Sequence, residues 1–319
     1  MSPLVMAAAD PMGHVLDKVL IGPLPGLESL GPAMTMNTLT MIVAAVLAVV
    51  ALMSVAKSVG TGPESQGNER YLTKGRFAQV IEVVVLYLRD KVIYPQLGES
   101  MGRRFAPLLL TLFFFILFNN LLGLVPLLDI QHLIGTFFGD SHFAIIGGTA
   151  TGRLAVTAGL AVTVFIIWQV NGIIESGVGG WAKHFLGGGP WYLAPIMLPV
   201  EIMGMIVKPV ALALRLFANM TAGHVLLAVL LGFTSAAPAA LGVLFGAPVG
   251  IVALFASVAI MFLELFVAFL QAFIFMFLTT LFIAQLAHHH HDEHAHDAGH
   301  GADHHDHAHG HAAPVAATA

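Results

Sequence analysis

Residues 212–224 read LALRLFANMTAGH and lie inside an apolar stretch, residues 193–287, that carries few ionisable side chains. Arg215 is the fourth residue of this motif. An arginine at the centre of a membrane helix costs roughly 2.5 to 3.5 kcal/mol on insertion scales, and intramembrane charges mark ion or substrate paths. The sequence therefore predicts that Arg215 has a function inside a membrane.

The composition is that of a polytopic membrane protein. Of the 319 residues, 57% are hydrophobic and 10% are charged, whereas soluble domains carry about 25% charged residues. The absence of cysteine excludes a disulfide framework and a thiolate metal site. The glycines of residues 177–189 are not followed by Gly-Lys-Ser/Thr, and no H-E-x-x-H is present, which argues against nucleotide binding and metalloprotease activity. We expect no cofactor and no nucleic-acid partner.

Five apolar segments are long enough to cross a bilayer, which takes about 20 such residues. We expect these crossings near residues 34–56, 105–128, 154–174, 199–231 and 250–287. A segment with charges among its apolar residues, residues 77–94, predicts an interfacial helix. The predicted fold is an all-α polytopic membrane protein.

The last two apolar segments are too long for one perpendicular crossing. At 1.5 Å per residue they would measure roughly 50 and 57 Å, against a hydrocarbon core of about 30 Å. We expect them to be steeply tilted and to form a hairpin with a broad face toward a neighbour in the membrane.

The distribution of charge predicts the orientation. Eight of the 13 basic residues fall within residues 57–104, so the positive-inside rule makes that segment cytoplasmic. Residues 1–33 are then outside, and after five crossings the tail, residues 288–319, is cytoplasmic. The tail holds 12 of the 17 histidines with acids and no basic residue, and we expect it to be disordered. Its irregular histidine spacing favours a solvated tail over a specific metal site.

Four polar residues share one face of the first long helix. Glu201, Lys208, Arg215 and Asn219 are seven, seven and four residues apart, which places them within about 40° of each other. His224 is nine residues after Arg215, about 180° around the helix, so it faces elsewhere. The pattern indicates one polar surface toward a partner and another inside the hairpin.

Each type of polar side chain in these helices suits a different part of proton transfer. Arg215 stays protonated, so it cannot relay a proton, but it can hold a nearby carboxylate in its ionised form. His224 and Glu264 can bind and release protons, and Gln271 shares a helix face with Glu264. Side-chain amides can orient water without titrating, and they occur at Asn119, Asn120, Asn219 and Gln271.

Structural roles compete with these functional ones. Lys208 can extend toward the cytoplasmic headgroups. Asn119 and Asn120 suit helix packing as well as channel lining. Glu264 and His224 can form a purely structural hydrogen bond between helices.

The motif of residues 212–224, with FNNLLGLVP at residues 118–126 and LQAFIFMFLTTLFIAQ at residues 270–285, resembles subunit a of the F-type rotary ATP synthase. The likeness covers about residues 70–286 and is strongest to the alphaproteobacterial or mitochondrial branch. It implies a stationary proton-channel subunit with two offset half-channels that couple proton flow to rotation of a ring of c subunits. It also implies b-type peripheral stalk subunits, an ATPase head and the bacterial inner membrane; the chain alone is not an enzyme.

The resemblance assigns roles residue by residue. Arg215 is the essential arginine that faces the ring carboxylate. The outer half-channel is lined or flanked by Glu264, His224, Asn219 and Gln271. Glu201 belongs to the cytoplasmic half-channel, and further lining residues are Asn119, Asn120 and Lys208. The competing hypotheses are a stand-alone secondary ion or metal transporter and a non-conducting scaffold.

Overall fold

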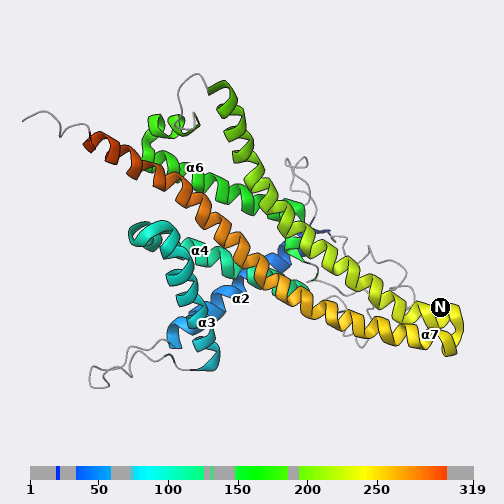
Figure 1. Ribbon diagram of the computed structural model, residues 1–319. Helices are drawn as coiled ribbons and strands as arrows, with labels where there is room; N and C mark the ends of the chain where they lie inside the picture. The colour runs from blue at the N-terminus through cyan, green and yellow to red at the C-terminus, as the bar shows by residue number, and fades with distance from the viewer. Residues whose placement is uncertain are drawn as a thin grey trace, which may run out of the picture.

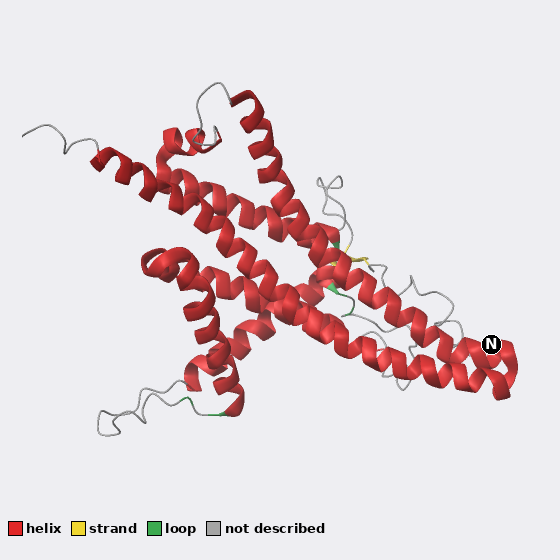
Figure 2. Ribbon diagram, in the orientation of Figure 1, coloured by secondary structure: helices red, strands yellow, loops and turns green. Residues whose placement is uncertain are grey.

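The computed structural model describes residues 19–21, 34–58, 73, 75–125, 131, 147, 149–185 and 194–299, with side chains up to residue 285. This part is nearly all helical, which confirms the predicted fold class (Figures 1 and 2). The elements are β1 (Val19–Ile21), β2 (Met34–Thr35), α2 (Met36–Ser58), α3 (Arg76–Tyr87), the π-helix η3 (Leu88–Ile93), α4 (Tyr94–Leu124), the 3-10 helix η4 (Ala150–Gly152), α6 (Leu154–Phe185) and α7 (Ala194–Gly299). The two short strands pair antiparallel. Most of the segment 1–33, expected outside, lies beyond the described residues.

Five helical stretches are long and apolar enough to cross a membrane, as expected. They are Met36–Ser58, Arg76–Leu124, Leu154–Glu175, Pro195–Thr234 and Ala236–Gln285. The second ends before residue 128 because Val125 is extended (ψ 124°), and a residue that precedes a proline disfavours the helical conformation. The third lies in α6, whose helical backbone continues beyond residue 174 and bends at Gly177 (φ 67°).

A bend divides the second stretch into two parts. Gly98 has φ 74° and ψ 170°, a conformation that glycine adopts without the steric cost of a side chain. Before it, α3 lies beside α2, and after it the rest of α4 runs in a different direction (Figure 1). The bend separates residues 77–94 from the following crossing, and an interfacial position for them stays a prediction.

The two longest stretches form an antiparallel hairpin within α7, drawn from green through yellow to orange in Figure 1. We call Pro195–Thr234 the first arm and Ala236–Gln285 the second arm. The break in helical geometry is at Gly242 (φ 75°, ψ 162°). Lys208 contacts Gln285, and Asn219 contacts Gln271, so positions rise along one arm as they fall along the other.

The backbone of α7 extends past residue 288 to Gly299, later than the composition indicates. No glycine or proline interrupts residues 288–298, so the backbone chemistry gives the helix no reason to end there. The remaining tail residues, 300–319, lie outside the described part of the chain, and the expected disorder there stays a prediction.

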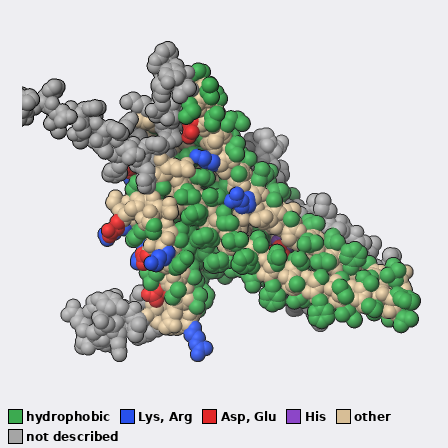
Figure 3. Space-filling model, in the orientation of Figure 1, with side chains coloured by type: hydrophobic (Ala, Val, Ile, Leu, Met, Phe, Trp, Pro, Cys, Tyr) green, Lys and Arg blue, Asp and Glu red, His purple; other side chains and the backbone are tan. Residues whose placement is uncertain are grey.

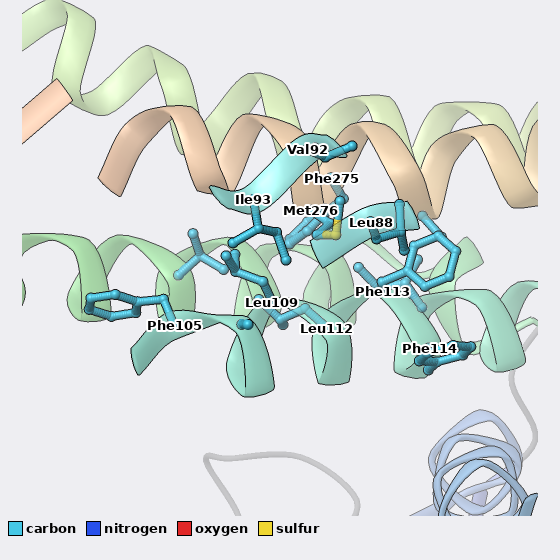
Figure 4. Close-up of a cluster of buried hydrophobic side chains, with 14 of the residues drawn as sticks. Leu88, Val92, Ile93, Phe105, Leu109, Leu112, Phe113, Phe114, Phe275 and Met276 are labelled. Carbon is cyan, nitrogen blue, oxygen red and sulfur yellow. The ribbon is translucent and has the colours of Figure 1, made fainter. Parts of the chain in front are cut away.

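An apolar cluster joins the second arm to η3 and α4 (Figure 4). Ile93, Leu109, Phe113, Phe275 and Met276 are fully buried in it. Lipid tails are as apolar as leucine, so in a membrane close van der Waals packing and interhelical hydrogen bonds stabilise such contacts. The cluster holds the second arm against the rest of the chain.

The bend at Gly242 requires a glycine at position 246, where the chain folds back on residues 237 and 238. A Cβ at Gly246 would lie 2.2 Å from the Ala237 carbonyl oxygen and 2.4 Å from Pro238 Cα. We expect Gly246→Val to force the two sides of this bend apart and to lower the yield of folded protein severalfold, because backbone atoms cannot move aside as a flexible side chain does. Detergent-solubilised yield by size-exclusion chromatography measures this. Gly204→Val is the control, because a Cβ at Gly204 meets no atom within 4 Å.

Candidate functional site

Arg215 lies on the exposed face of the first arm. Within the described residues its guanidinium forms no hydrogen bond or ion pair. Figure 3 shows single basic side chains standing out from an otherwise largely hydrophobic face. A cation in hydrocarbon is costly without a counter-charge. The geometry therefore leaves Arg215 available to an anion supplied by another molecule.

Asn219 and Gln271 connect the two arms one helical turn beyond Arg215. The Asn219 Nδ2 donates to Gln271 Oε1 at 3.0 Å. Gln271 is 2% exposed, and its own Nε2 has no hydrogen-bond partner. A buried amide N–H without a partner costs free energy, so this group is available to water or to a passing polar ligand.

His224 and Glu264 meet farther along the hairpin. The distance from His224 Nδ1 to Glu264 Oε1 is 3.5 Å, and the other ring nitrogen, Nε2, contacts the hydroxyl of Thr149. Glu264 is 3% exposed, and neither of its carboxyl oxygens has a hydrogen-bond partner. Two groups capable of proton exchange are thus held side by side at a polar site enclosed by protein.

A glycine on the first arm makes room for this carboxyl group. A Cβ on Gly223 would lie 2.6 Å from Glu264 Oε1 and 2.9 Å from its carboxyl carbon. A side chain at position 223 would require the Glu264 carboxyl group to move from its place beside His224. Gly223 therefore belongs to the site through its lack of a side chain.

The two adjacent asparagines of α4 have different contacts. Asn120 Nδ2 donates to the Ala268 carbonyl of the second arm at 3.2 Å, so Asn120 takes part in helix packing. Asn119 Nδ2 donates to Phe115 O in its own helix at 2.8 Å, and its buried Oδ1 has no partner. Of the two, Asn119 retains the free acceptor that channel lining needs.

Lys208 is held by protein groups. Its Nζ donates to Gln285 Oε1 at 2.9 Å and lies 5.3 Å from the ring centre of Trp168 and 5.6 Å from that of Phe282. Such cation–π contacts contribute about 0.5 to 2 kcal/mol each. The ammonium therefore contacts α6 and joins both arms, and its position relative to the headgroups stays a prediction.

Arg215 separates two sets of polar residues along the hairpin. Glu201, which is half-buried, and Lys208 precede it on the first arm. Asn219 and His224 follow it, and their second-arm partners are Gln271 and Glu264. The structure thus brings the residues expected at the outer half-channel together and keeps them apart from Glu201.

Three further residues at the site were not identified from the sequence: Thr149, Thr151 and Gly223. The threonines belong to a short polar run, residues 149–152, that precedes α6. Glycines and threonines are common throughout the chain, so their type alone carries no signal. Their role depends on contacts with residues distant in sequence.

Comparisons with known proteins identify the family of this chain. The family model described as ATP synthase A chain matches residues 34–284. Proteins named ATP synthase subunit a are similar in Myxococcus xanthus (44% identical, covering 72% of this chain and 67% of the relative), in Anaeromyxobacter dehalogenans (42%, covering 68% and 50%) and in Chloroherpeton thalassium (41%, covering 69% and 58%).

The chain spans between half and two thirds of the length of these three relatives. They come from bacteria outside the branch expected from the motifs, so the alphaproteobacterial or mitochondrial assignment stays a prediction. The family itself is shown, because its model covers most of the chain and both arms of the hairpin. The protein belongs to the ATP synthase A chain family.

Proposed function

We propose that this chain is the stationary proton-channel subunit of the membrane sector of an F-type ATP synthase. The observation that carries the proposal is the exposed Arg215 without a partner, placed between two sets of polar residues. Its counter-charge is the carboxylate of a neighbouring c-subunit ring, which the hairpin face meets within the membrane. Two half-channels separated by this charge couple proton flow to rotation of the ring.

The outer path runs along the inside of the hairpin. A proton enters near Glu264 and His224, the two groups there that can bind and release it. The amides of Asn219 and Gln271 then orient water toward the ring without titrating. Protonation neutralises the ring carboxylate, and a neutral acid can enter lipid at far lower cost than an anion.

The inner path begins on the other side of Arg215. After most of a revolution the ring acid reaches the region of Glu201 and loses its proton toward the cytoplasm. The resulting anion is stabilised by the guanidinium of Arg215, because an opposite charge within ~4–6 Å favours the ionised form. A fixed cation also opposes direct proton passage between the two paths, which prevents an uncoupled leak.

This mechanism implies the partners of the chain, the transported ion and the membrane in which the chain lies. The partners are the c-subunit ring, b-type peripheral stalk subunits and the ATPase head, with protons as the transported ion. The chain lies in the bacterial inner membrane with its amino terminus in the periplasm and its tail in the cytoplasm.

Purification of the chain from native membranes in mild detergent tests the proposal. We expect a c-subunit ring and an ATPase head to copurify in a fixed ratio, and proton conduction in liposomes to require the ring. If the purified chain alone transports an ion or metal in liposomes, and depends on its histidine-rich tail to do so, it is a secondary transporter and the proposal is wrong.

A further inference from the structure

A buried chain of hydrogen bonds links η4, α4 and the second arm. Thr151 Oγ1 of η4 donates to Asn120 Oδ1 of α4 at 2.8 Å, and Asn120 Nδ2 donates to the Ala268 carbonyl of the second arm at 3.2 Å. All three residues are 0% exposed. No water or lipid headgroup reaches these groups, so their partners must come from the protein.

The chemistry of the three groups allows one orientation of the Asn120 amide. The Ala268 carbonyl oxygen can only accept, so the amide NH₂ must face it. This leaves Asn120 Oδ1 pointing at Thr151, whose hydroxyl donates to it. The opposite orientation would place two acceptor oxygens against each other. The Ala268 carbonyl thus selects the orientation of the amide, and the Thr151 hydroxyl, as donor to Asn120 Oδ1, anchors the oriented amide to η4.

The held position lies between the two functional residues of that arm. Ala268 follows Glu264 by one helical turn and precedes Gln271 by three residues. These two residues must meet His224 and Asn219 on the first arm at the same time. A small slide or rotation of the second arm would break both contacts. Apolar packing in a membrane restricts such movement weakly, whereas a hydrogen bond is directional.

We propose that Thr151 is a positioning residue for the proton path: its hydroxyl anchors the Asn120 amide, which holds the second arm in the register that brings Glu264 to His224 and Gln271 to Asn219. Thr151 itself contacts no transported proton. This inference rests on the proposed function.

Substitution of Thr151 in the complete complex tests the role. Thr151→Val keeps the shape but removes the donor, Thr151→Ser keeps the hydroxyl, and Thr280→Val is the matched control. Thr280 is also 0% exposed, but its hydroxyl bonds to Met276 O of its own helix at 2.9 Å. Passive proton conductance of head-stripped membrane vesicles is measured per assembled complex.

We expect Thr151→Val to lower this conductance about tenfold, in line with the loss of one buried hydrogen bond. Thr151→Ser should restore most of it, and Thr280→Val should stay within about twofold of the unsubstituted protein. In an Asn120→Leu background, which has lower conductance, Thr151→Val should cause no further loss, because Thr151 acts through Asn120.

The outcomes separate the two proposals. If vesicles of the unsubstituted complex fail to conduct protons, the proposed function is wrong. If they conduct but Thr151→Val behaves like Thr280→Val, or lowers conductance equally with and without Asn120, the positioning role is wrong. Should Thr151→Val fail to assemble, Thr151→Ala takes its place, and equal conductance of the Ala and Ser variants overturns the inference.

Discussion

Arg215→Ala is expected to abolish proton-driven ATP synthesis while the membrane complex still assembles. The Arg215 side chain is exposed and makes no hydrogen bond or ion pair within the described residues, so its removal leaves no buried group of this chain without a partner. The passing ring carboxylate, however, loses its counter-charge. If the loss of this counter-charge raises the barrier by about 3 kcal/mol, a modest value for an ion in a membrane, the rate of ATP synthesis falls about a hundredfold.

ATP synthesis in vesicles with an imposed proton gradient measures the loss, and an immunoblot of the native complex measures assembly. Arg215→Lys should also be largely inactive, since an ammonium lacks the guanidinium fork and can release its proton. Arg104→Ala is the matched control, because Arg104 forms an exposed ion pair with Glu175 at 2.9 Å and such pairs contribute about 0–1 kcal/mol. Normal synthesis by the Arg215→Ala variant would refute the mechanism.

Glu264→Gln is expected to reduce ATP synthesis by about a hundredfold, the lower end of the range for loss of an acid–base group. The amide has nearly the same volume as the carboxyl group, so it fits beside Gly223 and His224. It cannot bind and release a proton near neutral pH. The loss should therefore appear in proton conduction and in synthesis together, with the amount of assembled complex unchanged.

Glu175→Gln provides the comparison, because this acid lies just before the bend at Gly177 of α6, in an exposed pair with Arg104. It should retain nearly full synthesis. A purely structural role for Glu264 makes a different prediction: Gln would substitute well, since it can donate and accept hydrogen bonds. Near-normal conduction in the Glu264→Gln variant would therefore assign Glu264 to packing and would remove it from the proposed path.

Much of the fold followed from segment length and composition. Five crossings were expected because runs of about 20 apolar residues have few alternatives, and the hairpin was expected because two runs exceed the bilayer thickness. Helix ends were less predictable. The bends at Gly98 and Gly177 each depend on one glycine with a positive φ. Any glycine could adopt this conformation, but few of the described glycines do, and the sequence does not show which ones.

The periodicity of one helix predicts which candidate residues of the first arm share a face. It could not show what each side chain meets on another element. For Lys208 the sequence left channel lining and extension toward headgroups open, and only the structure shows its contacts with Trp168, Phe282 and Gln285. For Asn120 the sequence left helix packing and channel lining open. Its hydrogen bond to the Ala268 carbonyl, 148 residues away, indicates packing.

The sequence by itself therefore determined that the protein is a helical membrane protein with a fixed charge at Arg215 that is energetically unfavourable in hydrocarbon. It could do so because the helix period, the length of apolar runs and the free-energy cost of a cation in a membrane are local properties. Only the tertiary structure decided that Arg215 has no partner within the described residues, that His224 lies between Thr149 and Glu264, and that Asn120 bonds to both Thr151 and Ala268. Those facts depend on side chains brought together from segments far apart in the chain, and no spacing within a single helix encodes them.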